Sequence, residues 1–105
     1  MIHYERTYEC SDEEALARLK SLARYWNKKW GIDPGWREST ANFDGRIKGV
    51  KFRGTVKIGE GRVEANIEAG FLAEKLGAKR YVSRKVDDYL NPSNSLESLD
   101  ARVPA

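Results

Sequence analysis

The sequence predicts a single α+β domain in which two helices pack on one face of an antiparallel sheet. Three observations support this fold class. A length of 105 residues is that of one ordinary domain. Apolar and polar residues alternate over residues 50–58 and again over 62–69, which is typical of an antiparallel sheet with one wet face. Helical periodicity marks two segments, 12–30 and 71–90, on either side of these strands.

The chain is expected to begin with a strand over residues 1–8, followed by the helix over 12–30. Ser11 and Glu14 have the spacing of a capping box, in which each side chain bonds the other residue's backbone N–H. Gly31 is placed to end the helix in a left-handed conformation.

The last turns of this helix read RYWNKKWG over residues 24–31. Two tryptophans among basic residues could form an exposed platform for nucleic acid or a lipid-like phase. Trp26 and Trp30 also continue the apolar stripe that starts at Ala15, which is the face that must cover the sheet. The spacing therefore predicts burial of both tryptophans, with an exposed edge left on Trp30.

Three further strands are expected, around 37–43, over 50–58 and over 62–69, with a tight hairpin at residues 59–61. The element order is then β-α-β-β-β-α, and the simplest sheet has four strands. Its open edges could pair two copies of the chain into a homodimer.

The second helix is expected over 71–90, with a kink or a new start at Gly77. The domain is expected to cover residues 1–91. Residues 92–105 are small and polar and favour a mobile C-terminal tail. Leu96, Leu99 and Val103 leave open a short docking helix instead.

Composition argues against several classes of protein. The single cysteine excludes an internal disulfide and a Cys-based zinc site, and it fits a reducing compartment. The N-terminus lacks the apolar core of a secretion signal, and no apolar run is long enough to span a membrane, so a cytoplasmic location is expected. No motif predicts a cofactor or a metal.

Groups for catalysis are sparse in the sequence. His3 fits a solvent-facing strand residue, and Cys10 fits an idle or buried thiol although it precedes a helix. Asp87 and Asp88 are adjacent and cannot share one helix face, so they are interpreted as a solvated pair. We therefore expect a protein that is not an enzyme.

The charge distribution suggests a binding surface. The net charge is +3, but residues 46–57 hold five basic residues and no acidic one. A basic strand face can meet phosphate or an acidic partner surface. The candidate partner- or anion-binding residues are Arg46, Lys48, Lys51, Arg53 and Lys57.

The basic strand face is next to an acidic strand and allows a second interpretation of its function. Glu64 and Glu68 of the next strand are expected to neutralise part of it. The alternative function is a small nucleic-acid-binding domain, which would use the basic strand with an exposed aromatic residue such as Trp36 or Tyr81. A second basic cluster consists of Lys79, Arg80, Arg84 and Lys85.

Residues 52–76, FRGTVKIGEGRVEANIEAGFLAEKL, resemble the small polyhydroxyalkanoic acid system proteins. The resemblance extends over residues 1–90, from MIHYER through WNKKWGI to VSRKVDDYL. It departs from the family at GRIKGVK, residues 45–51, and after Asn91.

The resemblance implies a setting in bacterial polyhydroxyalkanoate storage, at or near the storage granules, and brings no catalytic residues with it. Together with the sparse catalytic groups and the basic sheet face, this setting leads us to expect a non-enzymatic accessory protein that binds a partner protein or the granule surface.

Overall fold

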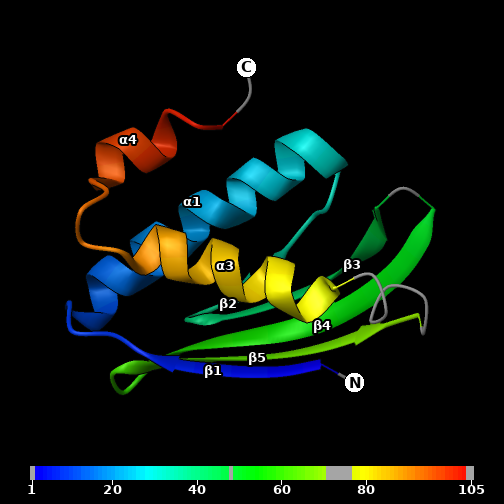
Figure 1. Ribbon diagram of the computed structural model, residues 1–105, viewed down its shortest axis with the longest axis horizontal. Helices are drawn as coiled ribbons and strands as arrows, with labels where there is room; N and C mark the ends of the chain where they lie inside the picture. Colours follow the sequence, from blue (N-terminus) through cyan, green and yellow to red (C-terminus); the bar gives the residue numbers. More distant parts are fainter. Residues whose placement is uncertain (1, 48, 71–76, 104–105) are drawn as a thin grey trace.

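A computed structural model describes residues 2–47, 49–70 and 77–103. It contains a curved antiparallel sheet of five strands in the order β1-β5-β4-β3-β2, with the helices on one side of it (Figure 1). The elements are β1 (Ile2–Thr7), α1 (Asp12–Trp30), β2 (Gly35–Arg37), β3 (Thr40–Ile47), β4 (Val50–Gly59), β5 (Arg62–Ala69), α3 (Ala78–Leu90) and α4 (Leu96–Asp100). The predicted α+β class is confirmed.

The sheet has five strands where the sequence predicts four. The single strand expected around 37–43 is a hairpin, in which β2 pairs with the first residues of β3. The turn between them places Glu38 at φ 54°, a left-handed conformation that glycine adopts far more readily than glutamate. Without a glycine in the turn, the sequence gives no signal that the chain reverses there.

The hairpin between β4 and β5 is confirmed. Glu60 and Gly61 form its two-residue loop, and both have positive φ, as the twist of a tight hairpin requires. The register places Arg53 opposite Glu68 and Lys57 opposite Glu64.

The N-cap and the C-cap predicted for α1 are present, but of the two bonds of the predicted capping box only the one to Ser11 is formed, and the Glu14 carboxylate lies 3.5 Å from Arg18 instead. The Ser11 hydroxyl accepts a hydrogen bond from the Glu14 backbone N–H at 3.1 Å. At the other end Gly31 has φ 73° and donates its N–H to the carbonyl of Asn27 at 2.9 Å.

The second helix starts at the residue that the sequence marks as a new start. Gly77 is the N-cap of α3, with φ 89°. Residues 71–76, the first part of the helix predicted over 71–90, lie outside the described residues.

The core lies between the sheet and the two long helices. Leu19 and Leu22 of α1 and Tyr89 of α3 pack with Ile58 and Val63 from the sheet. The burial predicted for Trp26 and Trp30 is only partial: both side chains are half-buried, because they lie toward the end of α1 rather than over the centre of the sheet. Trp26 still packs against the core.

The C-terminal segment contains the short helix that the sequence leaves open beside a mobile tail. α4 packs against α1 (Figure 1), and Leu99 is 0% exposed. The Ser95 hydroxyl accepts from the Ser98 backbone N–H at 3.1 Å and so caps the helix. How mobile this segment is in solution stays a prediction that amide exchange can test.

Candidate functional site

The basic strand residues lie on the face of the sheet that points away from the helices. Arg46 belongs to β3, and Lys51, Arg53 and Lys57 belong to β4; all four are exposed. Arg46 and Lys51 are direct cross-strand neighbours, so two like charges meet near the end of the β3–β4 hairpin. Lys48 lies outside the described residues.

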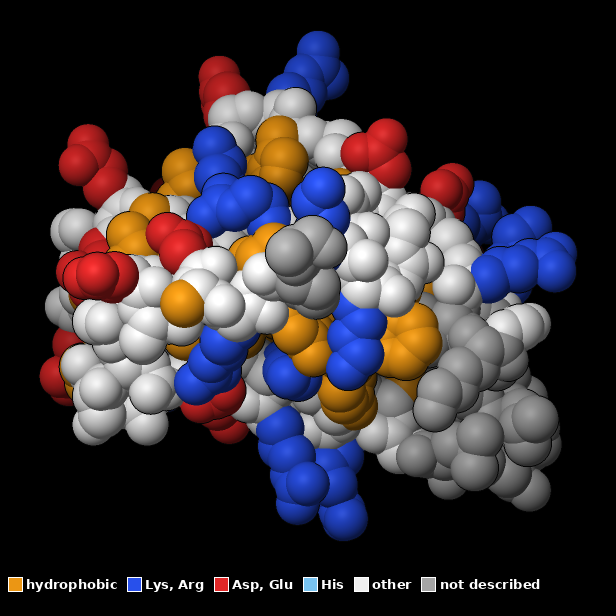
Figure 2. Space-filling view, turned by 90° about the horizontal axis from the view of Figure 1, so that it is seen from above, with side chains coloured by type: hydrophobic (Ala, Val, Ile, Leu, Met, Phe, Trp, Pro, Cys, Tyr) orange, Lys and Arg blue, Asp and Glu red, His pale blue; other side chains and the backbone are white. Residues whose placement is uncertain are grey.

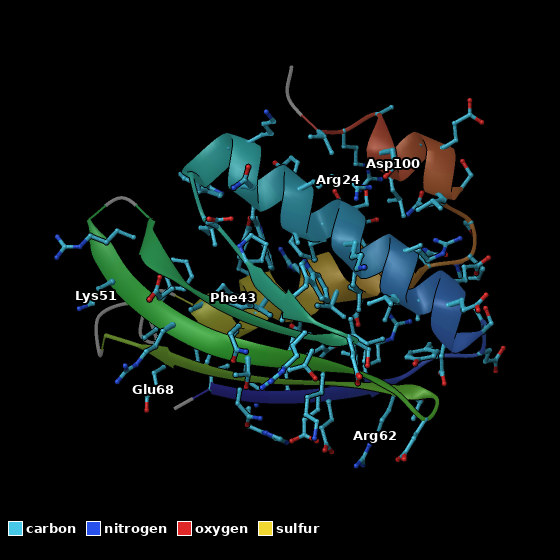
Figure 3. The ribbon with its side chains drawn as sticks, turned by 180° about the vertical axis from the view of Figure 1, so that it is seen from behind. Arg24, Phe43, Lys51, Arg62, Glu68 and Asp100 are labelled. Atoms are coloured by element: carbon cyan, nitrogen blue, oxygen red, sulfur yellow. The ribbon has the colours of Figure 1, made fainter. Side chains whose placement is uncertain are left out.

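Acidic residues share this face with the basic ones. The Arg53 guanidinium donates to the Glu68 carboxylate at 3.0 Å, and Asp44 lies opposite Arg53 on its other side. Figure 3 shows Glu68 and Arg62 pointing away from the helices, so both signs of charge occur on the outer face. The neutralisation expected from the β5 glutamates is thus seen at Arg53, while the binding role of the basic residues stays a prediction.

The middle of the outer face is polar and hollowed. A depression of about 470 Å³ is lined by residues that include Asn42, Thr55 and Asn66, which lie side by side on three neighbouring strands. His3 continues the row on β1, with its Nδ1 2.6 Å from the Asn66 side-chain oxygen. The solvent-facing position expected for His3 is present.

A second basic surface lies on the helical side, where α1 and α3 are neighbours. The Lys29 ammonium donates to the Tyr25 hydroxyl at 3.0 Å, and it lies 5.3 Å from the centres of the Tyr25 and Trp30 rings. Lys85 of α3 lies 4.8 Å from the Tyr25 ring and 6.0 Å from the Tyr81 ring. We call these five residues, Tyr25, Lys29, Trp30, Tyr81 and Lys85, the aromatic–lysine cluster.

The electrostatics of the cluster follow from these contacts. The hydrogen bond from Lys29 lowers the pKa of Tyr25, and the charge of Lys85 acts in the same direction. The same hydrogen bond raises the pKa of Lys29, which keeps its ammonium charged. The cluster joins the RYWNKKWG segment to the basic residues at 79–85, two features that the sequence shows separately.

Trp26 contacts both the aromatic–lysine cluster and the sheet. Its indole N–H donates to the Tyr81 hydroxyl at 3.2 Å, and its ring lies 6.4 Å from that of Phe43. Trp26 and Phe43 also line a small apolar cavity of about 40 Å³ between the helices and the sheet. That volume suits no more than one or two waters and is far below the size of a ligand site.

The residues considered for catalysis are placed as follows. Cys10 is half-buried, and burial together with the nearby Glu14 carboxylate raises the pKa of its thiol. Within the described residues, no group of three or more His, Cys, Asp or Glu side chains is arranged to hold a metal ion.

Asp87 and Asp88 keep much of their surface in solvent, as the sequence suggests, but each also has a partner of its own. Asp87 accepts a hydrogen bond from the Tyr4 hydroxyl and lies 3.2 Å from the Arg6 guanidinium, which attaches α3 to β1. Burial and this bond raise the pKa of Tyr4 to about 12. Asp88 turns the other way and pairs with Arg102. Adjacent residues on a helix point about 100° apart, so each finds its own partner.

Comparison with protein families gives the chain its setting. The family model described as "Putative polyhydroxyalkanoic acid system protein" matches residues 2–92. The chain belongs to this family. The match extends from β1 to the end of α3 and confirms the resemblance drawn from residues 52–76. A search of curated proteins and a search of solved structures found no match.

Membership of the polyhydroxyalkanoic acid system family agrees with a role in polyester storage. None of the described helices has the length and apolarity that a membrane crossing needs.

Proposed function

We propose that the protein is a non-enzymatic accessory protein of polyhydroxyalkanoate storage and acts by binding a partner protein or the granule surface. The observation that carries the proposal is the family match over residues 2–92, which takes in the whole sheet and both long helices.

The two faces of the molecule support a binding role. The outer face of the sheet has a depression and charges of both signs, which can complement the charges of a partner surface. The helical face is basic and carries the aromatic–lysine cluster, which favours a negatively charged partner.

Co-sedimentation with isolated polyester granules tests the proposal. The purified protein is mixed with granules from cells that make the polymer, and the mixture is centrifuged. In parallel, the immobilised protein is used to retain proteins released from those granules. We expect binding in at least one of the two assays. A protein that stays in the supernatant and retains no granule protein would contradict the proposal.

A salt titration separates this function from nucleic-acid binding. Phosphate contacts to nucleic acid release counterions, so such binding weakens steeply as ionic strength rises. Adsorption to an apolar polyester surface changes little. A granule signal with no retention of an oligonucleotide at low salt supports the storage role, and a signal that persists at high salt indicates apolar adsorption rather than attachment through the basic helical face.

A further inference from the structure

Where α1 and α3 meet, the helical side of the molecule carries basic residues only, although acidic residues flank this region in the first turn of α1, at the end of α3 and in α4. Residues 15–31 and 77–86 contain nine basic residues and no acidic one. α1 and α3 pack against each other, so the two segments contribute to one face (Figure 1). The nine are Arg18, Lys20, Arg24, Lys28, Lys29, Lys79, Arg80, Arg84 and Lys85.

Two of these nine are used within the fold. Arg18 is buried and donates to backbone carbonyls, and Arg24 pairs with Asp100 of α4 at 2.7 Å (Figure 3). The other seven form no ion pair with the carboxylates that the structure describes. Figure 2 shows Lys and Arg side chains gathered over the middle of this face, around apolar ones.

Several of these lysines are held in place over aromatic rings. Lys29 lies over Tyr25 and Trp30, Lys85 over Tyr25 and Tyr81, and Lys20 lies 5.3 Å from the centre of the Trp36 ring. Cation–π attraction and the Lys29–Tyr25 hydrogen bond restrict these side chains before any partner arrives. A restricted cation loses less conformational entropy when it binds an anion.

We propose that the helical basic face binds the phosphate layer of an anionic phospholipid surface. The cations are spread over two neighbouring helices and not along one edge, which suits a flat array of phosphates. Tyr25 and Tyr81 each join an apolar ring to a polar tip, the type of side chain favoured at a lipid–water boundary, whereas the indole N–H of Trp30 is buried. Tyr81 is the exposed member, with 39% of its surface accessible.

The same contacts disfavour single-stranded nucleic acid as the occupant. Binding of that kind stacks bases on open aromatic faces. In the aromatic–lysine cluster, Tyr25, Trp30 and Tyr81 each already have an ammonium group of this chain over the ring. The face thus offers charge to a phosphate layer but little ring surface to a base.

Vesicle flotation tests the proposal. The full chain is mixed with vesicles of phosphatidylcholine alone, or of phosphatidylcholine with an equal amount of phosphatidylglycerol. We expect flotation with the anionic vesicles only, and its loss at high salt. The test variant carries Lys29→Glu and Lys85→Glu. The matched control carries Lys51→Glu and Lys57→Glu on the sheet face, with the same change in net charge.

The two variants should differ clearly. Each basic residue near an anionic membrane strengthens vesicle binding by a similar amount, and removing two of them should weaken the binding roughly 30-fold. We expect at least that loss for the helical-face variant, and a much smaller loss for the sheet-face variant. A third variant, Lys29→Gln with Lys85→Gln, removes the two charges without reversing them and so serves as a control for misfolding. The melting temperature of each variant is measured first.

Three outcomes would overturn the proposal: equal flotation with both vesicle types, an equal loss in the two glutamate variants, or tighter binding to a single-stranded oligonucleotide than to anionic vesicles. The vesicles contain neither polyester nor granule protein. A negative result with vesicles therefore does not decide the storage role, which co-sedimentation with granules tests separately.

Discussion

Arg18 shows how much of the C-terminal structure depends on one residue. Its buried guanidinium donates to the backbone carbonyls of Tyr89 at 3.0 Å, Asn91 at 3.2 Å and Asn94 at 2.7 Å. These carbonyls belong to the end of α3 and the loop after it, where helix carbonyls lack partners of their own. One side chain of α1 therefore holds the path of the chain toward α4.

Replacing Arg18 with alanine should destabilise the protein strongly. The change leaves buried carbonyls without donors, and hydrogen bonds to a charged group contribute about 1.5–3 kcal/mol each. We expect a loss on the order of 3 kcal/mol in the free energy of unfolding, measured by urea denaturation. Arg24→Ala is the control, because Arg24 forms an exposed ion pair with Asp100. Equal losses in the two variants would contradict this role for Arg18.

Asp12 connects three segments through its carboxylate. It accepts hydrogen bonds from the Tyr8 hydroxyl at 2.6 Å and from the backbone N–H groups of Glu60 at 3.2 Å and Gly61 at 3.1 Å. These bonds, led by that from Tyr8, lower the pKa of Asp12 below its usual 3.8. They tie the start of α1 to the β4–β5 hairpin.

The lowered pKa predicts a dependence of stability on pH. The ionised carboxylate stabilises the fold, so its contribution is complete well above pH 3.8 and is lost as the pH falls through the lower folded-state pKa. Asp12→Asn should reduce stability at neutral pH and flatten its fall in acid, measured by thermal melts across pH. Glu13→Gln removes a charge from the same turn but none of these hydrogen bonds. The idea fails if both variants give the same profile.

Among the elements, β4 and β5 depend on a glycine at their closest approach. A Cβ on Gly54 would lie 2.7 Å from the backbone oxygen of Asn66 and 3.1 Å from the Ile67 side chain. Backbone atoms in the middle of a sheet cannot move aside without loss of pairing.

Gly54→Ala should therefore destabilise the protein by about 1–3 kcal/mol, the usual cost of overpacking. Gly45→Ala is a matched control in β3, because its nearest new contact, the Ile32 side chain, lies at 3.6 Å. Guanidinium unfolding of the two variants measures the difference. A Gly54 variant as stable as the Gly45 variant would show that the strands do not approach this closely.

α4 is expected to be a docked part of the domain. Leu99 is fully buried between the helices, and its truncation to alanine should cost about 2–5 kcal/mol. In the Leu99→Ala variant, hydrogen exchange should show the backbone amides of α4 exchanging with solvent faster than those of α1. Leu96→Ala, at a half-buried position, should have a smaller effect. If wild-type α4 amides exchange at the rate of an unfolded chain, the tail is mobile as composition suggests.

The sequence predicts elements best where local chemistry is explicit. The caps of α1, the alternation of β4 and β5 and the glycine at the β4–β5 turn each specify structure within a few residues. The β2–β3 hairpin was missed because Glu38 takes a conformation that its residue type does not signal. The partners of Asp87 and Asp88 were missed because β1 and Arg102 are distant in sequence.

At the scale of the whole molecule, the two faces differ in how their charges are distributed. The sheet face combines basic and acidic residues through pairs such as Arg53 with Glu68. The helical face gathers lysines and arginines from α1 and α3, segments more than 45 residues apart in the chain. The sequence shows both basic segments but does not place them together, because their meeting depends on how α3 packs against α1.

The sheet edges bear on the homodimer that the sequence suggests. β1 and β2 are the outer strands, and β2 pairs only three residues of β3. Both edges can in principle accept another strand. Dimerisation stays a prediction, which sedimentation velocity over a range of concentrations can test.

Fractionation of cells shows whether the protein binds at polyester granules. The tagged chain is followed in cells that accumulate the polymer and in the same cells grown without accumulation. We expect the protein to enter the granule fraction only when polymer is present, either by itself or with a granule-bound partner. An identical distribution in the two conditions would contradict it.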